Sequence, residues 1–254
     1  MKNMPQVSLG LIAVSRDCFP VELSRMRRKR VVTECRLKRI PIVEVETIIE
    51  GEKDIPKALA EFRTKGVNAL VIFLGNFGPE GPTTLLAQKF DGPVMFAAAA
   101  EETQKNLVQG RGDAYCGMLN ASYNIGLRKL RPYIPEYPVG TAAEVAAMMA
   151  AFIPIARVRL GLKGLKIFGF GPRPQDFLAC NAPIKPLFDL GVEVMENSEL
   201  DLYNIFLKVK GKPVVRSIAK EMAKELRAGN TYPDLLERLA QYELALTGFL
   251  EANL

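Results

Sequence analysis

Short apolar runs alternate with amphipathic stretches along the first part of the chain. Each run is short and bounded by turn residues, which is typical of strands, whereas the stretches between them repeat apolar residues at helical spacing. The run at 68–76 is apolar throughout, as in a strand that is buried on both faces. This alternation predicts right-handed βαβ units and a mostly parallel sheet. The predicted strands are 7–14, 40–47, 68–76 and 92–100, and the predicted helices between them are 21–39, 52–65 and 83–90.

The alternation restarts in the second part of the chain. An Ala-rich helix at 141–153 is predicted to end at Pro154, because proline breaks a helix interior. A new buried strand is predicted at 164–170 and a further strand at 191–197, followed by mostly helical sequence from Glu199 onward. The predicted fold class is therefore α/β, with two consecutive domains that have mostly parallel sheets, at residues 1–157 and 158–254.

The composition is that of a globular protein, with 48% hydrophobic and 24% charged residues. We find no apolar run near the roughly 20 residues that span a bilayer. The N-terminus has no secretion-signal pattern, and the four cysteines are too widely spaced to predict a disulfide framework or a zinc site. We therefore expect a cytoplasmic protein with reduced thiols and no membrane partner.

The net charge of +6 comes from one basic segment, Arg25 to Arg39, which carries eight Lys or Arg against one Glu. On a helix, such a run is usually a solvated face. A phosphate-binding stripe would require interleaved aromatic residues or a known nucleic-acid-binding fold, and the sequence shows neither. We expect no nucleic-acid partner.

The first predicted strand of each domain ends in a loop that carries an arginine and an aspartate. These pairs are Arg16 with Asp17, and Arg173 with Asp176. Ligands of open parallel sheets bind beyond the carboxyl ends of the strands, where these loops lie. The alternative is that each Arg pairs with its Asp and that the pair caps the following helix.

A third loop, "GNFGPEGP" at 75–82, follows a buried strand but is not a nucleotide-binding fingerprint. Pro79 and Pro82 remove backbone donors that a phosphate cradle needs. The loop is predicted to be a rigid turn that presents Asn76 and Glu80 above the sheet. Both a structural turn and a ligand contact remain open here.

The chain contains no histidine. This excludes Ser-His-Asp and Cys-His nucleophilic systems and any imidazole metal ligand from this chain. A divalent metal site made of carboxylates alone stays open. The nearest pair for it, Glu101 and Glu102, is predicted to open a helix instead. The sequence therefore predicts no catalytic residue and no metal ligand here, and it favours a binding domain.

The chain carries, in this order, the stretches "RDCFP", "LGNFGPEGP", "GRGDAYCGMLNASYNIGLR", "IPEYPVG" and "GPRPQDFLACN". Together these five stretches resemble the L-fucose and L-arabinose isomerase superfamily, most closely its L-fucose isomerase-like members. The resemblance implies Rossmann- or flavodoxin-like domains, of which the second is incomplete in this chain. It also implies a cytoplasmic homo-oligomer that interconverts an aldose and a ketose with a divalent metal, usually manganese, while carboxylates move a proton.

None of the family's metal ligands can be matched in this chain, so we expect them to lie outside it. The chain is then the N-terminal part of a sugar isomerase, inactive alone, and its apolar C-terminal residues favour truncation. The alternatives are a non-catalytic carbohydrate-binding or regulatory paralogue and one chain of a split isomerase. Arg16 is the best candidate for a contact with a substrate hydroxyl or with the catalytic carboxylates. The full set of candidate substrate-binding residues is Arg16, Asp17, Asn76, Glu80, Arg173 and Asp176.

The stretch 110–130 is a hallmark of the family's first domain, as the resemblance implies. Its residues predict a turn at Gly110–Gly112, an extended piece at Ala114–Cys116 and a helix from Ala121 to Leu130, with Asp113 and Asn120 as turn and cap residues and a buried Cys116. The segment forms either a wall between subunits or beside a neighbour's active site, or an internal packing element.

Overall fold

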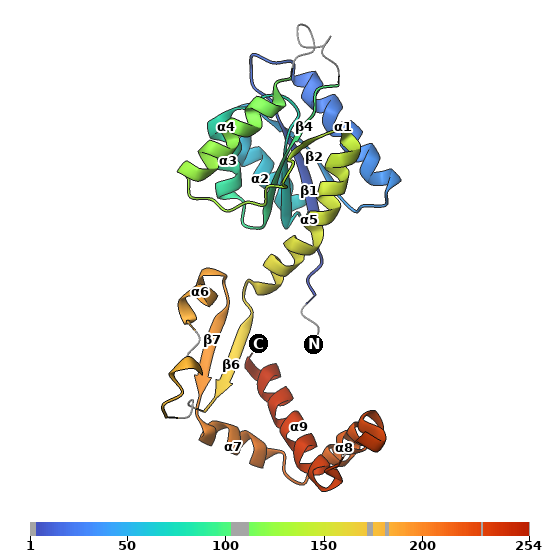
Figure 1. The fold of residues 1–254 in the computed structure, drawn as a ribbon, viewed down its shortest axis with the longest axis vertical. Coiled ribbons are helices and arrows are strands. Elements are labelled where there is room, and N and C mark those ends of the chain that lie inside the picture. The colour runs from blue at the N-terminus through green and yellow to red at the C-terminus, as the bar shows by residue number, and fades with distance from the viewer. Residues whose placement is uncertain (1–3, 103–111, 172–174, 181–182, 230, 254) are drawn as a thin grey trace. The chain divides into compact units, whose positions relative to one another are not determined.

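The computed structural model describes residues 4–102, 112–171, 175–180, 183–229 and 231–253 (Figure 1). The chain divides into two compact units, Met1–Gly161 and Leu162–Leu254. Each unit is described by itself.

The first unit is built on a five-stranded parallel sheet with the strand order β2-β1-β3-β4-β5. Strands β1, β3 and β4 are buried along their whole length, as their continuous apolar sequence predicts. The order confirms the α/β fold class and is that of flavodoxin-like domains. The strands are β1 (Leu9–Val14), β2 (Val43–Ile49), β3 (Ala69–Leu74), β4 (Val94–Ala99) and β5 (Val139–Gly140).

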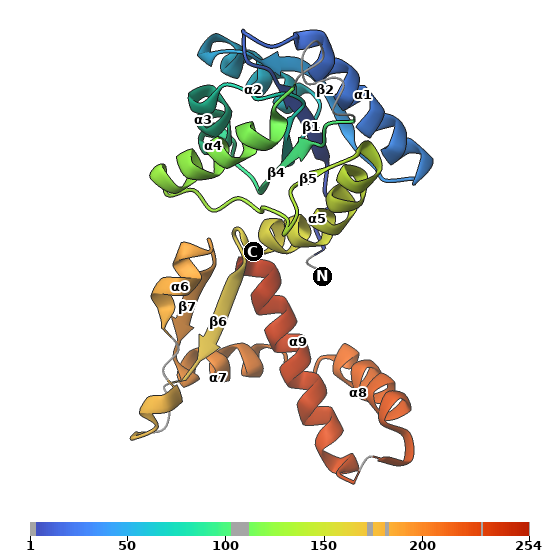
Figure 2. The ribbon, with the colours of Figure 1, turned by 45° about the horizontal axis from the view of Figure 1, so that its top comes forward.

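Helices cover both faces of this sheet (Figures 1 and 2). Helices α1 and α5 lie on one face and α2, α3 and α4 on the other. Right-handed crossovers require this placement of α1 to α4 for this strand order. Gly66, which follows α2, has φ 65° and therefore takes the left-handed conformation expected after a helix. The helices are α1 (Val21–Leu37), α2 (Ile55–Thr64), preceded by the short η1 (Glu52–Asp54), α3 (Glu80–Lys89), α4 (Ala114–Leu127) and α5 (Ala142–Leu162).

Helix α5 continues through Pro154, so the predicted break there is wrong. Phe152 and Ala156, on either side of the proline, are both buried, and this packing holds the helix together although Pro154 donates no backbone hydrogen bond. The resulting 21-residue helix is long and apolar enough to cross a membrane by length and composition, contrary to the sequence expectation. Val145 and Met149 belong to the buried core, whereas Ile155 and Val158 in the second half of the helix are exposed.

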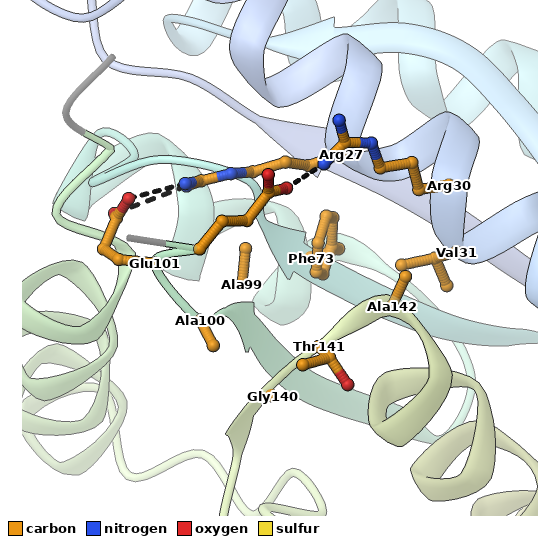
Figure 3. A pocket seen from close by; sticks show the side chains of 11 residues that line it. Arg27, Arg30, Val31, Phe73, Ala99, Ala100, Glu101, Gly140, Thr141 and Ala142 are labelled. Atoms are coloured by element: carbon orange, nitrogen blue, oxygen red, sulfur yellow. Dashed lines mark hydrogen bonds and ion pairs between the residues drawn. The ribbon is translucent and has the colours of Figure 1, made fainter. Parts of the chain in front are cut away.

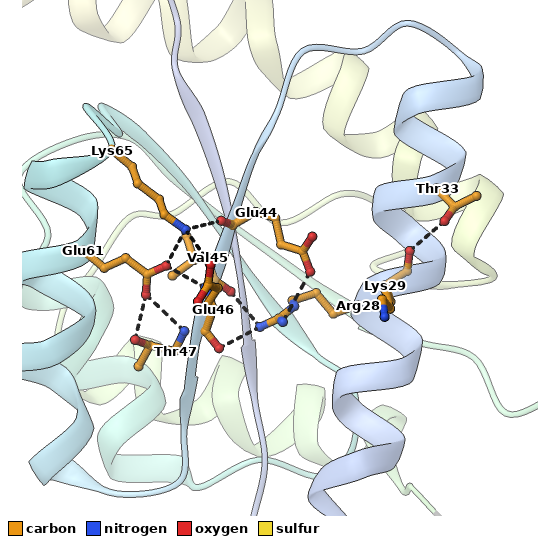
Figure 4. Close-up of polar contacts among 9 residues, drawn as sticks. All are labelled: Arg28, Lys29, Thr33, Glu44, Val45, Glu46, Thr47, Glu61 and Lys65. Carbon is orange, nitrogen blue, oxygen red and sulfur yellow. Dashed lines mark hydrogen bonds and ion pairs between the residues drawn. The ribbon is translucent and has the colours of Figure 1, made fainter.

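Two of the basic residues of α1 are buried, so the predicted solvated face is wrong for Arg27 and Arg28, each 5% exposed. They lie on the helix face that Ser24, Val31 and Cys35 turn toward the sheet. The side chains find acceptors there, as shown for Arg28 in Figure 4. Their position on the apolar face of the helix therefore buries these two arginines although they are charged.

A bulge in the edge strand β2 explains why Arg28 is drawn inward. Between Leu11 and Ala13, β1 advances two residues while β2 advances four, from Glu44 to Ile48, which leaves backbone groups of β2 unpaired. The Arg28 guanidinium donates to the carbonyl oxygens of residues 45 and 46, at 2.6 and 3.2 Å, and pairs with Glu44 at 3.3 Å. A side chain thus replaces the missing ladder bonds.

Glu61 of α2 bonds backbone N–H groups of the same bulge, on the side of β2 that faces away from Arg28 (Figure 4). Its carboxylate accepts hydrogen bonds from the backbone N–H groups of Glu46 and Thr47 at 2.6 and 3.0 Å, from the Thr47 hydroxyl at 2.7 Å and from Lys65 at 2.7 Å. Burial raises the pKa of the Glu61 carboxyl, but these hydrogen bonds outweigh it and lower the pKa from 4.5 to about 2.

We expect Glu61 to contribute a pH-dependent part of the stability. Because its folded-state pKa is depressed, this contribution is fully present above pH 4.5 and is lost as the pH falls toward about 2. Between these two pH values, the free energy of unfolding of Glu61→Gln should therefore fall less than that of the unmodified protein. Urea unfolding of both proteins at pH 7, 5 and 3 measures this. Parallel stability curves for the two proteins would contradict the assignment.

The second unit contains a small two-stranded parallel sheet. The predicted buried strand at 164–170 is wrong in its burial, because the residues of β6 alternate between half-buried and exposed. Phe168 and Phe170 pack against Phe249 of α9, at ring-centroid distances of 5.3 and 5.2 Å, whereas Ile167 is exposed. The elements are β6 (Lys166–Phe170), η3 (Leu178–Cys180), α6 (Ile184–Asp189), β7 (Glu193–Asn197), α7 (Glu199–Lys208), α8 (Pro213–Leu226), η4 (Arg227–Gly229), η5 (Pro233–Leu235) and α9 (Leu236–Asn253).

Candidate functional site

The loops after β1 and β3 meet at the carboxyl edge of the first sheet. These two strands are neighbours in the sheet. From β1 the chain continues to β2, toward one edge of the sheet, and from β3 it continues to β4, toward the other edge. Such a switch point is where ligands bind in open α/β sheets. Arg16, Asn76 and Glu80, distant in sequence, are brought together here.

Asn76 holds the two loops to each other. Its side-chain oxygen accepts from the backbone N–H groups of Arg16 and Gly78, both at 3.2 Å, and its amide donates to the Ser15 hydroxyl at 2.7 Å and the Pro20 carbonyl at 3.4 Å. Asn76 is fully buried. The prediction that the loop presents it above the sheet is wrong, because these backbone groups consume its hydrogen-bonding capacity.

Arg16 and Glu80 form an accessible ion pair on top of these loops. Their closest atoms are 3.7 Å apart, and their side chains are 41% and 43% exposed. The Arg16 guanidinium lies 5.0 Å from the centroid of the Phe77 ring, which stacks on Phe19 at 5.9 Å. The pair therefore stands on an aromatic support and keeps donors and acceptors available to a ligand.

Asp17 does not pair with Arg16, so the alternative of a mutual Arg–Asp pair does not hold in this loop. Asp17 is exposed, and its carboxylate accepts from the backbone N–H of Cys18 at 2.9 Å. The residue at the N-cap of α1 is Pro20. Asp17 thus lies at the rim of the site.

Helix α4 packs against the Phe77 loop. Gly117 makes this approach possible, because a methyl group there would lie 2.7 Å from the Phe77 carbonyl carbon. Asn124 donates to the Glu80 carboxylate at 3.2 Å, and Arg128 donates to Thr84 at 3.0 Å. The helix therefore sets the position of both Phe77 and Glu80.

This helix corrects the prediction for 110–130. Ala114–Leu127 is helical throughout, so the extended piece at Ala114–Cys116 is wrong, and Asn120 lies inside the helix rather than at a cap. Asp113 does occupy the N-cap position, with φ 47°. Cys116 is exposed rather than buried, because it does not lie on the face that packs inward. Gly110 and the predicted turn around it fall outside the described residues, except for Gly112.

A second polar cluster lies between α1 and the start of α5 (Figure 3). The buried Arg27 pairs with Glu101 at 2.6 Å and donates to the Gly75 carbonyl at 2.9 Å, while Arg30 pairs with Glu102. Together with Phe73, Thr141 and their neighbours, they line a cavity of about 170 Å³. Glu101 and Glu102 follow β4, and the helix that they are predicted to open would fall on 103–111, outside the described residues.

The sequence analysis does not predict that Arg27 pairs with Glu101, which lies 74 positions away. One signal was available: Arg27 falls three residues after Ser24 and four before Val31, on the face of α1 that is buried. No local pattern marks Glu101 as its partner, because the two residues meet only in the folded sheet.

The candidate loop of the second unit is described only in part. Arg173 lies outside the described residues, and Asp176 is exposed in the segment before η3. Their predicted binding role stays a prediction.

A divalent metal finds no set of ligands in the described residues, because no three Asp, Glu or Cys side chains come together there. The sequence has no histidine to add. The residues present thus do not fit the metal that the family resemblance implies.

The strand order defines a flavodoxin-like α/β domain, and Arg16 and Glu80 lie at its switch point. Residues 10–163 match the family described as fucose/sulfoquinovose isomerase, N-terminal domain. This match covers more than half of the chain, and the protein belongs to that family.

Among solved structures, the chain is similar to a periplasmic solute-binding protein of an ABC transporter from Actinobacillus succinogenes with bound D-allose, at 14% identity and a TM-score of 0.27. The similarity covers 80% of this chain and 66% of that one, slightly less than two thirds. A likeness at this level establishes no shared function. No curated protein matches the chain.

Proposed function

We propose that this chain is the substrate-binding front part of an aldose–ketose isomerase of the L-fucose or L-arabinose type. Family membership supports a sugar-isomerase relationship. The observation that carries the proposal is the accessible Arg16–Glu80 pair at the switch point. A sugar hydroxyl both donates and accepts, so it fits a guanidinium that only donates next to a carboxylate that only accepts. Because the pair is neutral overall, it suits an uncharged polyol.

The remaining residues of the site position this pair. Asn76 locks the loops from below, Phe77 supports Arg16, and Asn124 holds Glu80 from α4. Asp17 at the rim adds a further exposed acceptor. In the proposal these residues bind and orient the sugar, whereas ligands outside this chain hold the manganese or other divalent metal.

Arg16→Ala is expected to weaken L-fucose binding about 10- to 150-fold, since a hydrogen bond to a charged group contributes about 1.5 to 3 kcal/mol. Isothermal titration calorimetry measures this, and it suits a chain without tryptophan. The matched control is Arg25→Ala, which removes an exposed arginine paired with Glu22 on the same helix-loop segment. L-Arabinose is titrated in parallel. Absence of binding by the unmodified chain, or equal losses in both variants, would count against the site.

A non-catalytic carbohydrate-binding or regulatory protein is the second candidate function. It is favoured by the absence of a metal-ligand cluster in the residues that the structure describes. An isomerase assay with added Mn²⁺, run with and without a second polypeptide, separates a split isomerase from a non-catalytic protein. The chain alone should give no ketose, and activity that appears only with a second polypeptide would support a split isomerase. Turnover by the chain alone would contradict the assignment of the metal ligands to another segment.

A further inference from the structure

The cavity between α1 and the start of α5 has an apolar floor. Val31, Phe73 and Ala99 line it and are 1%, 1% and 6% exposed. In the view of Figure 3 they lie below the charged side chains. The volume of about 170 Å³ is close to that of a roughly 150 Å³ apolar cavity that takes up benzene. The cavity therefore has room for a ligand of about six or seven heavy atoms, with a small apolar part against the floor.

The polar wall of the cavity consists of two ion pairs. Arg27 and Arg30 belong to α1, and Glu101 and Glu102 follow β4. Two positive and two negative side chains give the described lining no net charge. A ligand with a single charge would take one member of a pair and leave the other without a partner, which is unfavourable away from bulk water. The charge balance thus favours a ligand with one positive and one negative group.

The two pairs differ in how firmly they are held. Arg27 is 5% exposed and holds Glu101 at 2.6 Å. The backbone N–H of Gly112 donates to the same carboxylate at 3.2 Å, so this inner pair is fixed from both sides. In the outer pair, the side chains of Arg30 and Glu102 are both 47% exposed, and such exposed pairs contribute little to stability. A ligand with charges of its own can therefore replace the outer pair, while the inner pair stays in place.

We propose that this cavity binds a small α-amino acid in its zwitterionic form, such as alanine. The carboxylate of the ligand pairs with Arg30 and its ammonium group with Glu102, in place of the outer pair. Both contacts are charge-assisted hydrogen bonds, which are roughly twice as strong as neutral ones. The methyl group lies against the apolar floor. None of the described lining residues is a candidate sugar-binding residue, so the proposal does not rest on the proposed function.

A polyol of the same size fits this wall less well. Glycerol would cover the outer pair from water and supply no opposite charge in return. The separation of Arg30 from Glu102 would then be uncompensated, whereas the zwitterion compensates both charges. Glycerol is therefore the matched comparison ligand, since it differs from alanine in charge more than in size.

An NMR titration of the full chain with L-alanine tests the proposal. The backbone amide signals of Ala99, Ala100 and Gly140, which line the cavity, should shift with a dissociation constant on the order of 1 mM, as expected for so small a ligand. Glycerol, propionate and ethylamine, which lack one or both charges, should each bind at least about 10-fold more weakly. L-Fucose is titrated separately, so a failure of the sugar site would appear at Arg16 and leave this result unchanged.

Two substitutions in the outer pair test which residues bind the ligand. Glu102→Gln and Arg30→Met should each weaken L-alanine binding about 10-fold or more, because one charge of the zwitterion loses its partner. Glu22→Gln is the matched control, since it neutralises an exposed glutamate that pairs with Arg25 on α1, and it should bind L-alanine as the unmodified chain does. Absence of shifts at the cavity, or equal binding of glycerol or of either singly charged ligand, would overturn the proposal. Equal effects of Glu102→Gln and Glu22→Gln would overturn it as well.

Discussion

Arg27→Met is expected to lower the free energy of unfolding of the first unit by about 3 kcal/mol, as when one partner of a buried ion pair is removed. Arg27 is 5% exposed and holds Glu101 at 2.6 Å and the Gly75 carbonyl at 2.9 Å. Methionine fills much of the space but donates nothing, so the carboxylate and the carbonyl lose their partner. Urea unfolding followed by circular dichroism at pH 7 measures the change.

Arg30→Met is the matched control, one helical turn away on α1. Arg30 pairs with Glu102, but both side chains are 47% exposed, and such pairs contribute about 0 to 1 kcal/mol. The expected difference between the two variants follows from burial alone. Equal effects of the two substitutions would show that the Arg27 pair is not buried in solution.

Gly117→Ala is the second substitution with a large expected effect, a loss of about 3 kcal/mol, at the upper end of the range for overpacking. The added methyl group would overlap the backbone of Phe77, and a backbone cannot swing aside as a side chain can. Either α4 or the Phe77 loop must move, which also displaces the support of Arg16. Urea unfolding and L-fucose titration of the same variant measure both consequences.

Gly126→Ala provides the control within the same helix. A methyl group at Gly126 meets nothing within 4 Å, so alanine should stabilise the helix by about 0.5 to 1 kcal/mol through its better helix propensity. Opposite signs for the two glycines are therefore expected. A loss at both positions would mean that the cost comes from the helix itself and not from the contact with Phe77.

The order of strands and helices in the first unit was predictable because burial imposes a period on the sequence. β1, β3 and β4 are continuously apolar, and each was recognised as a strand to within a few residues. Pro154 misled the prediction because the local rule ignores the packing of Phe152 and Ala156 on either side of it. The basic segment misled it for the same reason, since Arg27 and Arg28 find acceptors on elements that are remote in sequence.

The candidate site was predictable at the level of loops and not of individual roles. Loops after parallel strands gather at one edge, so Arg16 and Glu80 could be expected near each other. That Arg16 pairs with Glu80 and not with adjacent Asp17 depends on the direction of each loop. That Asn76 lies below the surface depends on which backbone groups the two loops leave unpaired.

The sequence alone determined the α/β class, the family and the absence of histidine chemistry, because these depend on apolar spacing, motifs and residue types. Only the tertiary structure decided which charges are buried, which residues share the switch point and which face of α4 stays exposed. These properties depend on contacts between segments far apart in the chain, such as Arg27 with Glu101 and Gly117 with Phe77. Such contacts leave no local pattern in one sequence, since each partner obeys only the periodicity of its own element.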